Sequence, residues 1–142
     1  MLKLLLPVDG SDNALRAVKH ALDSQTWYRE PPEYHLLNVQ SPIASGAVKM
    51  FISQQQLDAY YQEEGAMQLQ AARDLLQSAG VTFHAKIIVG EIESSVKRYA
   101  KEQAMSVIVM GTRGMGAVRN MVLGSIAAKI IYSAELPVLL IK

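Results

Sequence analysis

The chain has 142 residues, half of them hydrophobic, and a formal net charge of +1. This length suits one domain over residues 1–142, and the apolar content predicts a packed core rather than disorder. A nearly neutral chain has no strong electrostatic field for nucleic acid or a membrane surface, so we expect neither as a partner. The absence of cysteine excludes disulfides and thiolate metal sites.

The start of the chain is apolar but too short for a targeting or membrane segment. It reaches Pro7 and Asp9 without the small-residue pattern of a signal-peptide cleavage site. No run approaches the roughly 20 apolar residues that a membrane span needs. We therefore expect a soluble, cytoplasmic domain.

The first third of the chain predicts a strand, a helix and a second strand. "LKLLLPV", residues 2–8, is an apolar run typical of a strand buried on both faces, and it ends at a turn signal. Residues 11–24 carry apolar side chains at helical spacing, with Ser11 suited to cap the helix. "YHLLNV", residues 34–39, predicts the second strand. Residues 40–52 have no periodic pattern and predict an irregular loop.

The rest of the chain continues the alternation of helices and strands. A long helix is predicted over residues 53–78, and Gly80 is well placed to end it. The later predicted elements are strands at 81–89, 106–111 and 136–142 and helices at 92–104 and 125–134.

The element order βαβαβαβαβ predicts the fold class. Strands that alternate with helices form parallel sheets, and right-handed crossovers leave few topologies. We expect a doubly wound five-stranded parallel sheet of order 3-2-1-4-5, with helices on both faces. Ligands of such sheets bind at the carboxyl ends of the strands, where the order reverses. This rule brings "VDGSD", residues 8–12, next to "GTRGMG", residues 111–116.

The glycine-rich stretch "GTRGMGAVRNMVLGS" has features of an anion site. Gly111 and Gly114 lack Cβ, so their backbone is free to adopt positive φ and to approach a ligand. Gly124 and Ser125 stand at a predicted helix start, where free N–H groups and the helix dipole favour phosphate. The Ser125 hydroxyl would add a donor.

Simpler interpretations of these residues stay open at this point. The glycines are also compatible with a plain turn that binds nothing. Ser125 could cap the helix without a ligand, and residues 9–11 could form a turn followed by a helix cap. Arg113 and Arg119 either add positive charge to the site or point into solvent. Two common nucleotide motifs do not fit, because no Lys precedes Ser125 and no G-x-G-x-x-G follows the first strand.

The motifs together carry a family resemblance. The spacing G-x2-G-x9-G-[S/T] is met at Gly111, Gly114, Gly124 and Ser125, and residues 8–11, 107–114 and 123–142 also match. The chain resembles the nucleotide-binding type of universal stress protein over its whole length.

The resemblance implies an ATP site with a role for each matching position. Asp9 would bind the ribose, Val39 would contact adenine through its backbone, and phosphate oxygens would hold any magnesium ion. The other implied site residues are Pro7 and Val8 beside the nucleoside, Met110 and Gly111 flanking it, and Gly114, Gly124, Ser125, Ile126 and Ala127 at the phosphates. We add Arg113 as a source of positive charge.

The resemblance also implies a function and an assembly. We expect an ATP-binding regulatory or stress-response module that forms a homodimer through Val138 to Lys142, because such an apolar edge strand is unprotected. Catalysis is not predicted, since His20, His35 and His84 lie away from the glycine stretch and suit structural or surface roles. Two alternatives remain: an interaction protein that works without nucleotide, and a slow ATP hydrolase.

Overall fold

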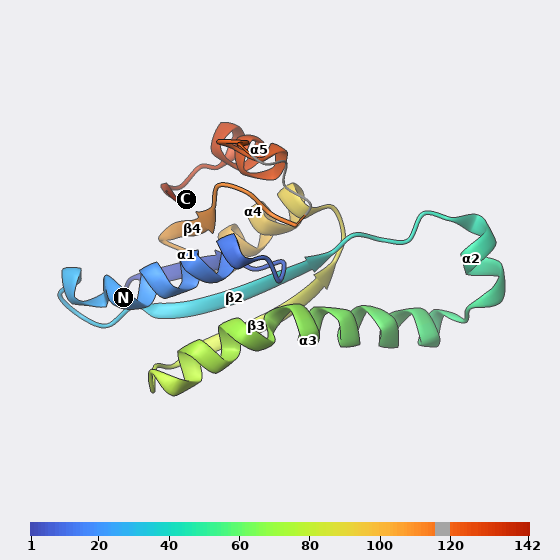
Figure 1. Cartoon of the computed structure of the whole chain (residues 1–142), viewed down its shortest axis with the longest axis horizontal. Helices are drawn as coiled ribbons and strands as arrows, with labels where there is room; N and C mark the ends of the chain where they lie inside the picture. The colour runs from blue at the N-terminus through green and yellow to red at the C-terminus, as the bar shows by residue number, and fades with distance from the viewer. Residues whose placement is uncertain (116–119) are drawn as a thin grey trace.

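The computed structural model describes residues 1–115 and 120–142, which form five strands, five α-helices and one short 3-10 helix (Figure 1). The strands are β1 (Lys3–Pro7), β2 (Glu33–Gln40), β3 (Phe83–Val89), β4 (Val107–Gly111) and β5 (Val138–Ile141). The helices are α1 (Asp12–Asp23), α2 (Gly46–Phe51), α3 (Gln54–Ser78), α4 (Ile92–Glu102) and α5 (Ser125–Ser133), with the 3-10 turn η1 at Gln25–Trp27.

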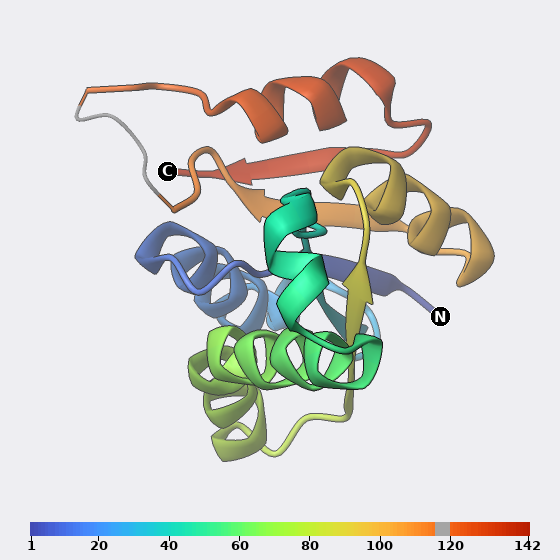
Figure 2. The ribbon, with the colours of Figure 1, turned by 90° about the vertical axis from the view of Figure 1, so that its right-hand side faces the viewer.

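The strands form one parallel sheet in the order β3-β2-β1-β4-β5, which confirms the predicted topology. The side chains of α1 and α3 pack on one face of the sheet, and those of α4 and α5 pack on the other. Figure 2 shows the sheet between these two pairs of helices. The order reverses at β1, whose neighbours are β2 on one side and β4 on the other.

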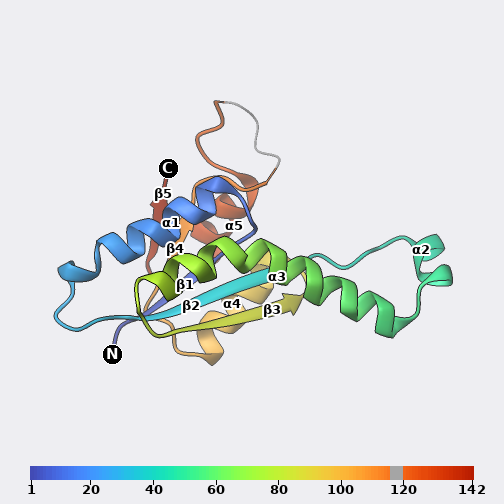
Figure 3. The same ribbon diagram turned by 60° about the horizontal axis from the view of Figure 1, so that its bottom comes forward.

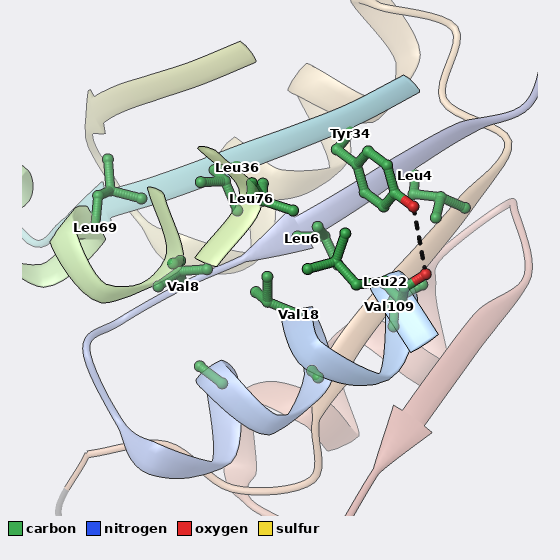
Figure 4. Close-up of a cluster of buried hydrophobic side chains, with 14 residues drawn as sticks. Leu4, Leu6, Val8, Val18, Leu22, Tyr34, Leu36, Leu69, Leu76 and Val109 are labelled. Carbon is green, nitrogen blue, oxygen red and sulfur yellow. Dashed lines mark hydrogen bonds between the residues drawn. The ribbon is translucent and has the colours of Figure 1, made fainter. Parts of the chain in front are cut away.

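The apolar run of β1 belongs to both cores. Leu4 and Leu6 pack with α1 and α3, whereas Leu5 faces α4, and all three side chains are fully buried. Alternate residues of a strand point to opposite faces, so a central strand of a two-sided sheet must be apolar throughout. Figure 4 shows the first of these cores, in which the Tyr34 hydroxyl donates a hydrogen bond to the Ala21 carbonyl.

The helix ends follow the predicted capping signals. The Ser11 hydroxyl accepts a hydrogen bond from the Ala14 N–H and so caps α1. After α3, Gly80 has a φ of +69°, and the Val81 N–H donates to the Leu76 carbonyl, as in a Schellman motif. Glycine adopts this left-handed conformation without steric cost, which explains why the long helix ends here.

The prediction of an irregular loop over residues 40–52 is wrong in part. The helix α2 occupies Gly46–Phe51, and the Ser45 hydroxyl caps it by accepting from the Val48 N–H. Figures 1 and 3 show α2 standing away from the sheet, and its side chains are not buried. A helix of six residues without a buried stripe leaves no periodic pattern in the sequence, so the prediction had no signal to use.

A buried amide network joins the end of β1 to β2 and α3. The Asn38 side-chain amide donates to the Val8 carbonyl and to Gln68 Oε1, both at 2.8 Å. Gln40 Nε2 donates to Asn38 Oδ1 at 2.7 Å. Asn38 is fully buried, so each of these groups depends on the others for its hydrogen bonds.

We predict that Asn38→Ala lowers the free energy of unfolding by about 1–3 kcal/mol, because it removes the side-chain donor of the buried Val8 carbonyl and one of the two donors to Gln68 Oε1. Urea denaturation measures this loss. The control is Gln70→Ala, which removes an exposed hydrogen bond to Asp74 on the surface of α3 and should change stability by less than about 0.5 kcal/mol. Equal effects of the two substitutions would contradict the role given to the network.

Candidate functional site

An open cavity of about 380 Å³ lies at the carboxyl ends of the strands, where the strand order reverses. It is bounded by the loop after β1, the segment after β4, the start of α5 and the end of β2. All of the site residues predicted from the sequence line it: Pro7, Val8, Asp9, Val39, Met110, Gly111, Arg113, Gly114, Gly124, Ser125, Ile126 and Ala127. Arg119, the other arginine considered, lies outside the described residues.

Asp9 joins the two loops that border the cavity. Its Oδ1 accepts from the Ser11 N–H at 2.9 Å, and its Oδ2 accepts from the Met115 N–H at 3.0 Å. Charge-assisted hydrogen bonds of this kind are stronger than neutral ones. The carboxylate therefore holds the segment after β4 against the loop after β1, two parts of the chain that are far apart in sequence.

Gly111 is required by a close approach of α1. A Cβ at this position would overlap the side-chain oxygen of Asn13, which is 5% exposed. Asn13 Oδ1 accepts from the Arg113 N–H at 2.7 Å, and its Nδ2 donates to the Ile141 carbonyl at 3.0 Å. One amide side chain thus ties α1 to the segment after β4 and to β5.

The expectation that the first two glycines of the signature adopt positive φ is wrong. Neither Gly111 nor Gly114 has positive φ; among the described residues, the glycines with positive φ are Gly10 and Gly80. A Cβ at Gly114 would lie 2.5 Å from the Asp9 carboxylate. These glycines are needed because side chains of the loop after β1 and of α1 lie against their backbone, not because they adopt a left-handed conformation.

The amino end of α5 opens into the same cavity. Gly124 is its N-cap residue, with extended backbone and no side-chain cap, and its N–H donates to the Thr112 carbonyl at 2.6 Å. Ser125 is the first residue of the helix, so the alternative that it acts as the cap is wrong. Ser125, Ile126 and Ala127 all line the cavity. The N–H groups of a helix's first turn have no partner within the helix, which favours an anion there.

The walls of the cavity divide into an apolar part and a polar part. Apolar side chains come from the centre of the sheet and from α4: Val8, Leu37, Val39, Ile92, Val96 and Met110. Among the described lining residues, Asp9 and Arg113 are the charged ones. A concave apolar site with a few convergent polar groups is the usual form of a small-molecule site.

Sequence reasoning also missed Asn13, which does not line the cavity but shapes it through its contacts with Gly111 and Arg113. It shares one buried stripe of α1 with Ala17 and Ala21. A polar residue at a buried helical position was the signal that could have identified it, because such a group needs partners. Gln68 of α3 gave no such signal, since its position beside the cavity follows from the packing of α3 on β2.

Comparison with known proteins identifies the family. The universal stress protein family matches the chain over residues 1–142. The chain belongs to that family. It is 28% identical to the universal stress protein MJ0531 of Methanocaldococcus jannaschii over 141 residues, which cover 99% of this chain and 81% of that protein. It is 26% identical to YxiE of Bacillus subtilis, with 99% and 98% covered.

Solved structures of the family share this fold. The hypothetical protein MJ0577, also of M. jannaschii, superposes with a TM-score of 0.84 at 26% identity, covering 99% of this chain and 95% of that one. More distant structures include universal stress proteins in complex with cAMP, with AMP (Arabidopsis thaliana) and with dAMP (Archaeoglobus fulgidus), at TM-scores of 0.70, 0.69 and 0.66 and identities of 20%, 20% and 21%. Each covers at least 99% of this chain, and at these identities they show a shared fold.

In the part of the chain that the structure describes, no helix combines the length and apolar character that crossing a bilayer requires.

We predict that Gly111→Ala destabilises the protein by about 1–3 kcal/mol, because the new Cβ displaces the buried Asn13 side chain and breaks its hydrogen bonds with the Arg113 N–H and the Ile141 carbonyl. Thermal unfolding followed by circular dichroism measures the loss. The control is Gly46→Ala in α2, where a Cβ meets nothing within 4 Å; there alanine should be neutral or slightly stabilising. If Gly111→Ala is also neutral, the contact with Asn13 does not constrain the site.

Proposed function

We propose that this protein binds an adenine nucleotide, ATP foremost, in the cavity at the carboxyl ends of its strands, and that it acts as a nucleotide-dependent regulatory module. The observation that carries the proposal is the uncapped amino end of α5, which opens into the same cavity as Asp9 and the apolar wall. This combination offers a site for phosphate, a carboxylate that accepts hydrogen bonds from hydroxyl groups, and an apolar surface for a flat base. The adenine-nucleotide complexes of related structures support it.

The nucleoside would occupy the part of the cavity nearest the sheet. Val8, Val39 and Met110 supply apolar contacts for the base, and the backbone of Val39 at the end of β2 supplies polar groups for its edge. Asp9 would accept hydrogen bonds from the ribose hydroxyls. Its carboxylate already accepts from two backbone N–H groups, so it is held in place before a ligand binds.

The phosphates would lie between the segment after β4 and the start of α5. The N–H groups of Ser125, Ile126 and Ala127 and the Ser125 hydroxyl supply donors, and Arg113 supplies charge. A magnesium ion would be held mainly by phosphate oxygens.

Binding without rapid hydrolysis fits the groups that line the cavity. Asp9 is the one carboxylate among the described lining residues, and none of those residues is a histidine. Both oxygens of Asp9 are engaged with backbone N–H groups, so it is poorly placed to activate water at a terminal phosphate. Nucleotide binding would then act through mass action, by stabilising the folded state at high ATP concentration. Action in the cytoplasm stays a prediction.

The proposal is tested by denaturing the purified protein, identifying any released nucleotide, and titrating ATP and AMP into the emptied protein by calorimetry. Asp9→Asn should weaken both nucleotides about tenfold, because it replaces a charged acceptor at the ribose. Arg113→Ala should weaken ATP more than AMP, because it removes charge at the phosphate end. Phosphate release over time measures any hydrolysis.

The matched control is Asp12→Asn, an exposed residue in the first turn of α1 that does not line the cavity. It should leave both affinities unchanged. Failure of the unmodified protein to bind at millimolar ATP would favour the alternative, an interaction protein that works without nucleotide. Fast phosphate release would favour the hydrolase.

We also propose a homodimer through the free edge of β5, over Val138 to Lys142. β5 is a terminal strand of the sheet, Leu139 on it is 36% exposed, and the nearby α5 exposes Tyr132. An unprotected apolar edge is suited to pair with a copy of itself around a twofold axis.

Leu139→Lys should convert the dimer to a monomer, because the twofold axis brings two like charges close together in the interface. Light scattering after size exclusion measures the mass. The control is Val89→Lys on β3, the opposite edge of the sheet, where the side chain is 40% exposed; it should leave the mass unchanged. A dimer that survives the first substitution, or dissociates with the second, would place the interface elsewhere.

A further inference from the structure

A cluster of one carboxylate and two imidazoles lies on the sheet away from the cavity. Glu33 and His35 are two residues apart on β2, so their side chains share a face, and His84 is the register partner of His35 on β3. The one ligand atom that each side chain offers lies within 4.8 Å of the other two. Glu33 Oε1 is 2.6 Å from His35 Nε2 and 3.4 Å from His84 Nε2.

The inner imidazole of this cluster is fixed by its surroundings. His35 is 3% exposed, and its Nδ1 lies 2.8 Å from the hydroxyl of Tyr99 on α4. Without a metal, the 2.6 Å contact means that Nε2 donates to Glu33 and Nδ1 accepts from the Tyr99 hydroxyl. In the other neutral tautomer Nδ1 donates to Tyr99, which leaves the Nε2 lone pair for a metal ion. Histidines that bind metals usually have such a partner on the other ring nitrogen, which sets the tautomer and the ring orientation.

Glu33 is available as an anionic ligand. Its hydrogen bond with His35 is the main cause that holds the pKa of Glu33 below its usual value, so the carboxylate is ionised at neutral pH. Lys3 Nζ lies 4.0 Å from the same oxygen, and it donates to the Gln103 carbonyl at 3.2 Å, so this lysine has another partner when Glu33 turns toward a metal ion.

We propose that Glu33, His35 and His84 bind a divalent transition-metal ion, of which zinc fits best. Zinc takes imidazole and carboxylate ligands at about 2.0–2.2 Å in a tetrahedral arrangement, which places the ligand atoms about 3.3 Å apart. The distance from Glu33 to His84 already has this value, and the one from Glu33 to His35 must widen by less than about 1 Å. Two nitrogen ligands disfavour magnesium and calcium, which prefer oxygen alone.

The two outer ligands have the freedom that this adjustment needs. The side chain of His84 is 57% exposed on an edge strand, and that of Glu33 is 22% exposed, whereas His35 stays in place against Tyr99. Exposure of His84 also leaves the remaining coordination position open to water. The result is a site with three protein ligands and one solvent ligand.

The site is independent of the proposed nucleotide site. His35 lies four residues before Val39 on β2, a separation of about 13 Å along the strand. None of the three ligands lines the cavity. Zinc binding is therefore testable whether or not the protein binds ATP.

The test titrates zinc into the untagged, full-length protein by calorimetry and by competition with a chromogenic chelator, with cobalt as a spectroscopic probe. We expect one ion per chain and visible cobalt bands of tetrahedral intensity. His84→Ala should weaken binding more than tenfold, and because His84 is exposed the variant should fold, which circular dichroism checks. Tyr99→Phe should weaken binding about tenfold and shift the cobalt bands. The substitution leaves all three ligands in place but removes the hydroxyl that bonds to His35 Nδ1.

The control is His20→Ala on α1, which removes the one histidine of the chain that is not a proposed ligand. It should leave affinity, stoichiometry and spectrum unchanged. The proposal is overturned if the unmodified protein shows no saturable zinc binding, if His84→Ala binds as tightly as the unmodified protein, or if His20→Ala abolishes binding.

Discussion

The reversal of strand order at β1 is the constraint on which the rest of the site depends. Because β1 has β2 on one side and β4 on the other, the crossover helices leave the sheet in opposite directions and cannot cover the ends of both strands. A cavity forms there, and the loop after β1 meets the segment after β4. Asp9 then joins these segments with two charge-assisted hydrogen bonds, which keeps the cavity's rim in one shape.

The glycines of the signature serve this junction more than they serve conformational freedom. At Gly111 and Gly114 the backbone lies against the side chains of Asn13 and Asp9, so a Cβ would push those side chains away. At Gly124 the backbone closes on the Thr112 carbonyl, which joins the segment after β4 directly to the start of α5. Tight contacts inside the protein therefore require glycine at these positions. A ligand would bind to the surface that those contacts form.

The two ends of the strands carry different chemistry. The carboxyl ends offer backbone N–H groups, one carboxylate and an apolar wall, a combination suited to an anion attached to a flat base. Nearer the amino ends, Glu33, His35 and His84 gather nitrogen and oxygen ligands on the face that α4 covers. Helix α4 contacts both regions, since Ile92 and Val96 line the cavity and Tyr99 lies against His35.

The sequence by itself determined the order of the elements, because strand burial and helical periodicity are local patterns. The crossover rules then gave the sheet order, and the family resemblance gave most of the residues that gather at the cavity. Only the tertiary structure decided which contacts those residues make. The partners of Asn13 and the cluster around His35 depend on register and packing between segments far apart in sequence, and a single histidine in a strand carries no sign of its neighbour. The short helix α2 was not predicted for a different reason: none of its side chains is buried, so no buried stripe marks it.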